Sequence, residues 1–230
     1  MTDHWMNYGK TDLYRDAATK AYAYKLTSLE IDADGAPDAY APDNKGLDTL
    51  ANANYPNGKW RDILVPDPAN PAQAYVRPDG PGRGCFISKT TLADPSLPDT
   101  EAGKYADATT IPYIVFPGNF YHLTGTGQIG DFVVAVNLAT GKVVGGVVAD
   151  IGPASHPLEE VSVGMVKALG GTNPNPRKGT GVPRGPFGFI VFPGSHGQLK
   201  WPLAAADIDA TAQNLLAQAG GLDTFAPAFV

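Results

Sequence analysis

Proline and glycine recur along most of the chain, and they limit how much regular helix it can form. Of the 230 residues, 21 are proline and 27 are glycine. Proline interrupts the hydrogen-bond ladder of a helix, and glycine loses more conformational entropy than other residues when it is ordered. The chain also has too little Lys, Glu and Leu for a helical bundle, although a hydrophobic share of 43% still allows a buried core. We expect a mainly β protein with long loops.

The charge of the chain excludes several classes of function. Lys and Arg number 17 and Asp and Glu number 23, which gives a net charge of −6. No nucleic-acid partner is expected, because phosphate binding needs a basic surface. No membrane contact is expected either, since no apolar run approaches the roughly 20 residues that cross a bilayer. Met1–Tyr24 lacks the apolar block of a signal peptide, and the single Cys85 cannot form an intramolecular disulfide.

Hydrophobic patterning is clearest in the second half of the chain. Asp131–Asn137 and Val143–Asp150 are apolar runs separated by a tight turn, which predicts a β-hairpin. Leu158–Leu169 is the clearest predicted helix, with Ser155 as its N-cap. The other expected elements are two short strands within Asp12–Ile31, a helical turn within Gly46–Ala53, strands at Cys85–Ser88, Tyr113–Phe116 and Phe187–Phe192, and a helix at Ala204–Gln218 capped by Asp207.

One five-residue segment occurs twice. Ile114–Gly118 and Ile190–Gly194 both read Ile-Val-Phe-Pro-Gly. Chance accounts for this repeat, or the chain has a pseudo-twofold β architecture in which equivalent strands end at equivalent corners. Gly130-Asp131 at the start of a strand is typical of the double-psi β-barrel. The predicted fold is mainly β, with a six-stranded double-psi β-barrel-like core, long loops and a few short helices.

A single domain is expected over residues 1–230. Its barrel core spans about residues 85–195, and the N-terminal acidic-loop region and the C-terminal helix pack on that core. The acidic loop is Asp32–Asp43, where carboxylates alternate with Gly and Pro. We expect the protein to be a monomer.

Metal and nucleophile motifs are weak in this sequence. The four histidines do not stand at metal-ligand spacing, and no Gly-x-Ser-x-Gly elbow occurs. Asp32-x-Asp34-Gly35 is similar to the start of a calcium loop, but no glutamate closes a twelve-residue loop. Calcium at this loop stays open as a minor alternative, and no metal and no cofactor are expected.

Two carboxylates are placed where they could act together. Asp150 ends an apolar strand, and Glu160 follows in the first turn of the predicted helix. Such a pair is the minimum needed for glycoside hydrolysis, because one carboxyl protonates the leaving oxygen while the other activates water. Spacing alone leaves alternatives open. Asp150 could cap a turn and Glu160 could serve only the helix dipole, and helical periodicity does not separate Glu160 from Glu159.

Three segments, in order, resemble the chitosanases of glycoside hydrolase family 75. Asp150–Pro153 followed by Glu160–Val163 is similar to the family's Gly-Asp-x-Gly and Gly-Glu-Ala-Ser-Ile segments. Glu30–Ala36 is similar to its Met-Asp-Ile-Asp-Cys-Asp-Gly-Ala segment, and Ile111–Val115 to its Pro-Tyr-Val-Val strand. The matching segments span about 140 residues.

The resemblance implies an endo-acting, inverting hydrolase of β-1,4-linked glucosamine polymers, which the family secretes. Asp150 and Glu160 match its two essential carboxylates, and we expect Glu160 to be the acid and Asp150 the base. Asp32 and Asp34 match its acidic loop and would contact the ammonium groups of the substrate. A net charge of −6 suits a cationic polysaccharide. Aromatic rings are also expected to stack on the sugars, and the candidates are Tyr113 and Tyr121, with Tyr40, Trp60, Phe120 and Trp201.

Two other functions remain open from the sequence. The chain could hydrolyse a different glycan, such as peptidoglycan. It could also be a non-catalytic carbohydrate-binding module on the same barrel. A buried salt bridge from Arg177 or Lys167 to Asp150 or Glu160 would favour a non-catalytic role, whereas two carboxylates that line one open groove would favour catalysis.

Overall fold

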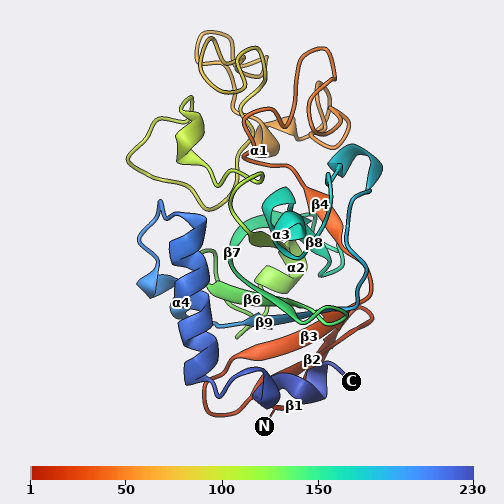
Figure 1. Cartoon of the computed structure of the whole chain (residues 1–230). Helices are drawn as coiled ribbons and strands as arrows, with labels where there is room; N and C mark the ends of the chain where they lie inside the picture. The colour runs from red at the N-terminus through yellow and green to blue at the C-terminus, as the bar shows by residue number, and fades with distance from the viewer. Residues whose placement is uncertain (1) are drawn as a thin grey trace.

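The computed structural model describes residues 2–230 and shows a mainly β protein built on one nine-stranded mixed sheet (Figure 1). The strand order is β1-β2-β3-β9-β6-β7-β5-β8-β4. The strands are β1 (Thr2–Tyr8), β2 (Thr11–Asp16), β3 (Tyr22–Leu26), β4 (Glu30–Asp32), β5 (Tyr113–Pro117), β6 (Phe132–Asn137), β7 (Lys142–Gly152), β8 (Glu160–Ser162) and β9 (Phe187–Val191). The helices are α1 (Trp60–Ile63), α2 (Gly118–Tyr121), α3 (Val163–Ala168) and α4 (Ala205–Gln218), with 3₁₀ turns η1 (Ala102–Lys104), η2 (Pro176–Lys178), η3 (Ser195–Gln198) and η4 (Leu222–Ala228).

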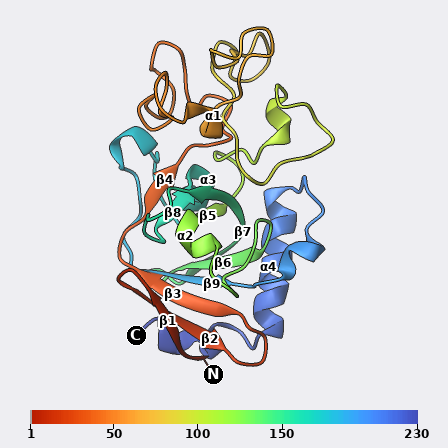
Figure 2. The ribbon, with the colours of Figure 1, turned by 180° about the vertical axis from the view of Figure 1, so that it is seen from behind.

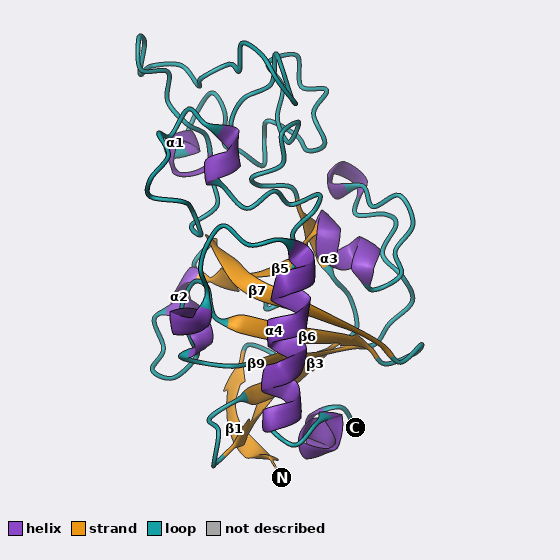
Figure 3. Cartoon of the chain, turned by 60° about the vertical axis from the view of Figure 1, so that its left-hand side comes forward, coloured by secondary structure: helices purple, strands orange, loops and turns teal. Residues whose placement is uncertain are grey.

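The predicted hairpin is confirmed and forms the centre of the sheet. β6 pairs with β7 in antiparallel register on one side and with β9 on the other. Every residue of β6 is buried, because the sheet is covered on both faces. Gly145 is needed where α4 crosses β7, since a Cβ at that position would lie 2.6 Å from the Cα of Asp209. Figure 3 shows α4 lying along this part of the sheet.

Long loops gather at one end of the molecule. The segment between β4 and β5 contains only the short α1 and η1, and it lies at the opposite end from both chain termini (Figures 1 and 2). The acidic loop follows β4, the edge strand that pairs with β8, and therefore lies at this end of the molecule. Within residues 2–230, no helix is both long and apolar enough to cross a bilayer.

The helix predicted over residues 158–169 is confirmed only in its second half, and its first part is a strand. This difference changes the surroundings of Glu160. Glu160–Ser162 is strand β8, and the helix begins only at Val163. β8 forms because β4 pairs with it in parallel register, with Glu30 opposite Glu160. The N-cap is Ser162, whose Oγ accepts a hydrogen bond from the backbone N–H of Met165, and not Ser155.

Several smaller predictions are also corrected. The N-terminal region holds β1, β2, β3 and β4 rather than two strands. Gly46–Ala53 forms turns instead of a helical turn, because side chains such as Asn44 Oδ1 accept from its backbone N–H groups. Cys85–Ser88 makes isolated bridges only. The C-terminal helix is confirmed, but Ala204 rather than Asp207 stands at its N-cap.

Both copies of the repeated segment end a strand. β5 ends at Pro117 and α2 begins at Gly118, whereas β9 is followed by Gly194 and the 3₁₀ turn η3. Gly194 has φ of 84°, a left-handed conformation that favours glycine. The repeat thus marks two strand ends from which the chain turns into a short helical element.

Candidate active site

A cleft of about 1090 Å³ lies between the acidic loop and the ends of β7 and β8. Its lining contains seven acidic side chains and two lysines, Lys59 and Lys89. The acidic residues are Glu30, Asp32, Asp34, Asp48, Asp62, Asp150 and Glu160. This excess of negative charge would attract a cationic ligand and repel an anionic one.

Asp150 reaches the cleft through an irregularity in the sheet. In the parallel pair of β5 and β7, Ile114 is opposite Val148, but Val115 is opposite Asp150, so the register skips Ala149. Such bulges redirect side chains beside active sites. Oδ1 of Asp150 accepts three hydrogen bonds, from Thr91 N at 2.9 Å, Thr91 Oγ1 at 2.6 Å and Ile151 N at 2.8 Å. Desolvation raises the pKa of Asp150, while these hydrogen bonds oppose that rise.

Glu160 has a different environment in the same cleft. It is the first residue of β8, and a Cβ at Gly152 would lie 3.0 Å from Oε2 of Glu160, so glycine leaves room for the carboxyl group. Within residues 2–230, no group donates a hydrogen bond to the Glu160 carboxyl. Desolvation, followed by repulsion from Asp32 and Asp150, raises the pKa of Glu160 well above its usual range.

The choice between Glu159 and Glu160 follows from strand geometry. Successive side chains of a strand point to opposite faces. Glu160 lines the cleft, whereas Glu159 does not, and Oε2 of Glu159 accepts a hydrogen bond from Ser28 Oγ at 3.1 Å on the exposed surface. Glu160 is therefore the candidate that can meet a ligand in the cleft.

The two acidic-loop candidates lie beside Asp150. Asp32 ends β4 and is 7% exposed, and its Oδ1 accepts from the N–H of Asp34 at 2.9 Å. Desolvation and the nearby Asp150 carboxylate raise the pKa of Asp32 to about 7. Desolvation and repulsion from Asp32 also raise the pKa of Asp34 well above its usual range. Oδ1 of Asp34 is buried and accepts no hydrogen bond from the described residues, 2–230.

Three of these carboxylates lie close enough together to hold a cation. One oxygen from each of Asp32, Asp34 and Asp150 lies within 4.8 Å of the other two. Oxygen ligands at such spacing suit a hard divalent ion such as Ca²⁺ or Mg²⁺. Bound protons relieve the same repulsion, as the raised pKa values of the three groups indicate.

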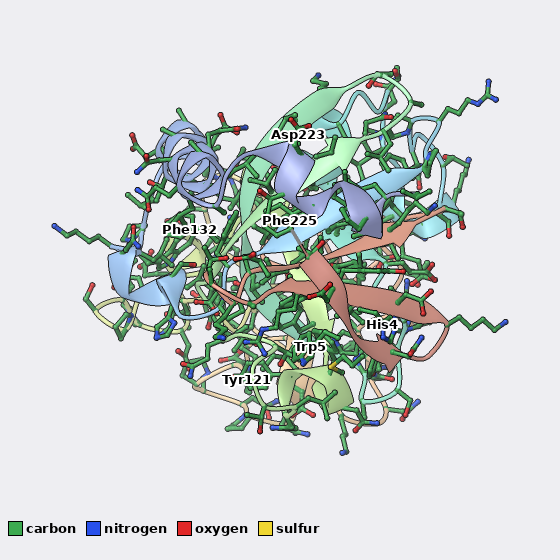
Figure 4. All side chains as sticks on the ribbon, turned by 90° about the horizontal axis from the view of Figure 1, so that it is seen from below. His4, Trp5, Tyr121, Phe132, Asp223 and Phe225 are labelled. Carbon is green, nitrogen blue, oxygen red and sulfur yellow. The ribbon has the colours of Figure 1, made fainter. Side chains whose placement is uncertain are left out.

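The two tyrosines expected to bind substrate do not line the cleft. Tyr113 is fully buried, so its ring cannot stack on a sugar; its hydroxyl instead bonds to Asp32 Oδ2. Tyr121 lies on α2 and packs against the other side of the core, beside His122. Figure 4 labels Tyr121 in a view from the end that carries β1. Trp60 and Phe120 are also core residues, and Tyr40, at 3% exposure, is the aromatic residue of the cleft wall.

The basic residues that could have neutralised the catalytic candidates bind elsewhere. Nη2 of Arg177 donates to the backbone oxygens of Asn44, Gly46 and Asp48 at 2.8, 3.2 and 2.7 Å. Nζ of Lys167 lies 3.4 Å from the carbonyl oxygen of Thr109. Across residues 2–230, no salt bridge involves Asp150 or Glu160, so the arrangement that would have favoured a non-catalytic role is not found.

Sequence reasoning did not identify three contributors to this cleft. Thr91 holds Asp150, Asp48 adds a buried carboxylate, and His156 Nε2 pairs with Glu30 at 3.2 Å. Thr91 is 59 residues from Asp150, and no local motif links the two positions. His156 lies between Asp150 and Glu160 in the chain, which is the one signal that could have indicated its place near the cleft.

Comparison with known proteins leaves the site to be interpreted from its own chemistry, since neither a protein-family model nor a curated protein matches this chain.

Proposed function

We propose that this protein is an endo-acting glycoside hydrolase that cleaves chitosan, the β-1,4-linked polymer of glucosamine, by an inverting two-carboxylate mechanism. One observation carries the proposal: Asp150 and Glu160 line the same acidic cleft in contrasting environments. Asp150 accepts three hydrogen bonds on one oxygen, whereas Glu160 accepts none from residues 2–230. In hydrolases, two carboxyl groups take acid and base roles when their environments push their pKa values apart.

The hydrogen bonds support one assignment of the acid and base roles. Donors aimed at Asp150 stabilise its ionised form, which suits a base. Desolvation and neighbouring negative charge raise the pKa of Glu160 and so favour its protonated form, which suits an acid. This supports the expectation from sequence that Glu160 is the acid and Asp150 the base.

The proposed reaction balances with these two groups and one water molecule. Glu160 donates its proton to the leaving glycosidic oxygen as the bond from that oxygen to C1 breaks. A water molecule gives a proton to Asp150 while its oxygen bonds to C1 on the opposite ring face, so the configuration inverts. Solvent then removes the proton from Asp150 and returns one to Glu160.

The charge of the cleft supports chitosan over a neutral polysaccharide. Seven acidic side chains line it against two lysines. Neutral sugars are usually held by exposed aromatic faces, but the tyrosine of this cleft wall, Tyr40, is almost fully buried. Protonated glucosamine carries a positive charge on each sugar, so charge attraction can replace stacking. We propose that Asp32 and Asp34 contact these ammonium groups.

The fold of the sheet centre is also part of this proposal. We propose that the centre of the sheet is a six-stranded double-psi β-barrel. The parallel pairs β5–β7 and β4–β8, the contact of β5 with both β7 and β8, and the two Pro-Gly strand ends support this. The sheet order described above is open from β1 to β4, so the barrel requires a closure that this order does not contain. An experimental structure that also lacks this closure would overturn the barrel without affecting the assignment of the carboxylates.

The test is a reducing-end assay on a panel of chitosan, chitin and peptidoglycan. We expect cleavage of chitosan and loss of that activity in both Asp150→Asn and Glu160→Gln, with unchanged circular dichroism. NMR of fresh product should show the α-anomer first. Cleavage of peptidoglycan alone would move the activity to another glycan, and binding of chitosan without cleavage would show a carbohydrate-binding module. Near-normal turnover in both variants would overturn the assignment of the pair.

A further inference from the structure

Thr91 makes the closest contacts to the proposed catalytic base. Its Oγ1 donates to Asp150 Oδ1 at 2.6 Å, and its backbone N–H donates to the same oxygen at 2.9 Å. Ile151 N adds a third donor to Oδ1 at 2.8 Å. Oδ2 of Asp150 receives no hydrogen bond from any residue in 2–230. One carboxylate oxygen is thus held in place, while the other has no protein donor and can accept a proton from water.

The segment around Thr91 is fixed on strand β7 independently of Asp150. The N–H of Leu92 donates to the carbonyl oxygen of Ala149 at 2.8 Å, at the position that the β5–β7 register skips. Thr90 Oγ1 donates to Leu92 O at 2.7 Å and accepts from Ala106 N at 2.9 Å. Because the backbone on both sides is anchored, the Thr91 hydroxyl is placed before any substrate binds.

We infer that Thr91 is a positioning residue that orients Asp150 as the base, through a hydroxyl that holds Oδ1 and directs Oδ2 to the water. This inference rests on the proposed function. The Thr91 side chain is exposed and makes no other hydrogen bond within residues 2–230, so the contact to Asp150 is its one polar role. If the contact only stabilised the fold, its removal would lower the free energy of unfolding and leave the pKa of Asp150 unchanged.

Other charges also act on Asp150 and would remain when Thr91 is changed. The charge of Asp150 raises the pKa values of Asp32, Asp34 and Glu160, and the Lys89 ammonium favours the ionised form of Asp150. Desolvation raises the pKa of Asp150, and the hydrogen bonds from Thr91 and Ile151 oppose that rise. Loss of the shortest one should move its titration to higher pH.

The experiment compares Thr91→Val, which keeps the shape and the backbone N–H, with Thr91→Ser, which keeps the hydroxyl. Thr211→Val is the matched control, because Thr211 lies on α4 and its hydroxyl, among residues 2–230, bonds only to Asp207 O. In Thr91→Val we expect kcat/KM on chitosan oligosaccharides to fall on the order of tenfold. The acidic limb of its pH profile should move to higher pH. Thr91→Ser and Thr211→Val should resemble the wild type.

A second measurement does not need activity. The carboxyl ¹³C signal of Asp150 can be titrated in the wild type and in Thr91→Val, and the midpoint should be higher in the variant. An unchanged midpoint and pH profile in Thr91→Val, while Asp150→Asn is inactive, would overturn the role of Thr91 and leave the proposed function standing. If the wild-type protein cleaves no chitosan, the proposed function fails, and with it the catalytic role of Thr91. The NMR midpoint then still shows whether Thr91 controls the ionisation of Asp150.

Discussion

The hydroxyl of Tyr113 lies 2.8 Å from Oδ2 of Asp32 and 2.9 Å from the carbonyl oxygen of Asp34. Tyr113 is the first residue of β5 and is fully buried, so this contact ties the acidic loop to the sheet from below the cleft. Tyr113 thus contributes to the site through its hydroxyl rather than through the face of its ring.

Removing that hydroxyl should destabilise the protein. In Tyr113→Phe, the buried Asp32 carboxyl loses a donor that favours its charged form, and we expect a loss of about 1–3 kcal/mol in the free energy of unfolding at pH 8. Urea unfolding measures this difference. Tyr14→Phe is the control, because Tyr14 is half-buried on β2 and its hydroxyl has no hydrogen-bond partner within residues 2–230. Equal stabilities of the two variants would contradict the role of the contact.

The cluster of carboxyl groups should make stability depend on pH. The pKa of Asp32 is raised to about 7, and those of Asp34, Asp150 and Glu160 are also raised. Between about pH 4 and 7 the folded chain therefore binds more protons than the unfolded chain, so stability falls as pH rises. We expect a lower Tm at pH 8 than at pH 5.

Asp32→Asn should make this dependence shallower, since one of the raised carboxyl groups is gone. The exposed Asp223, labelled in Figure 4 near the C-terminus, provides the control variant Asp223→Asn, which should keep the wild-type slope. Differential scanning calorimetry at four pH values measures both. A Tm that stays constant or rises from pH 5 to pH 8 would count against the buried cluster.

The boundary between β8 and α3 should depend on Ser162 and not on Ser155. Ser162 is fully buried, and its Oγ accepts from Met165 N and Tyr113 N and donates to Ile111 O. Ser162→Ala should therefore cost about 1–3 kcal/mol, because two backbone donors and one acceptor lose a partner. Ser155→Ala, at an exposed position, should be close to neutral. Urea unfolding compares the two variants. If Ser155→Ala lowers the free energy of unfolding as much as Ser162→Ala does, the prediction is wrong.

Arg177 should protect the segment that follows the acidic loop, residues 44–48, against proteolysis. Its guanidinium bonds to three backbone carbonyls between Asn44 and Asp48, while Lys45 in the same segment is exposed. Arg177→Ala should accelerate tryptic cleavage after Lys45, because the three anchors are lost. Lys178→Ala removes the neighbouring exposed charge and should not change that rate. Mass spectrometry of the first fragments measures it, and equal rates in both variants would show that Arg177 does not hold the segment.

Local patterns in the sequence predicted the centre of the sheet well. Asp131–Asn137 and Val143–Asp150 are apolar, and a tight turn between them leaves a hairpin as the simplest way to bury both. The central strands β5 and β9 were predicted for the same reason. These elements depend on neighbours in the chain or on continuous burial, which are the properties that hydrophobic patterning reports.

Pairing between distant segments accounts for the errors. Glu160–Ser162 becomes a strand because Glu30–Asp32 lies beside it, 130 residues earlier in the chain, and helical periodicity contains no information about that partner. Tyr113 was predicted to stack on a sugar because aromatic side chains suit stacking, but the sheet buries its ring. The carboxylates Asp150, Glu160, Asp32 and Asp34, which the sequence singled out, line one cleft. Thr91 has no pattern that could reveal it.

The most direct test of the account compares two substrates in the Glu160→Gln variant. A general acid matters when the leaving group needs a proton, and it typically contributes about 10²- to 10⁴-fold. A chitooligosaccharide needs that proton, whereas its 2,4-dinitrophenyl glycoside does not. We predict that Glu160→Gln loses about 10²-fold or more of its kcat on the oligosaccharide but retains most of its kcat on the dinitrophenyl glycoside, while Asp150→Asn loses both. Equal losses on the two substrates in Glu160→Gln would contradict the assignment of Glu160 as the acid and Asp150 as the base.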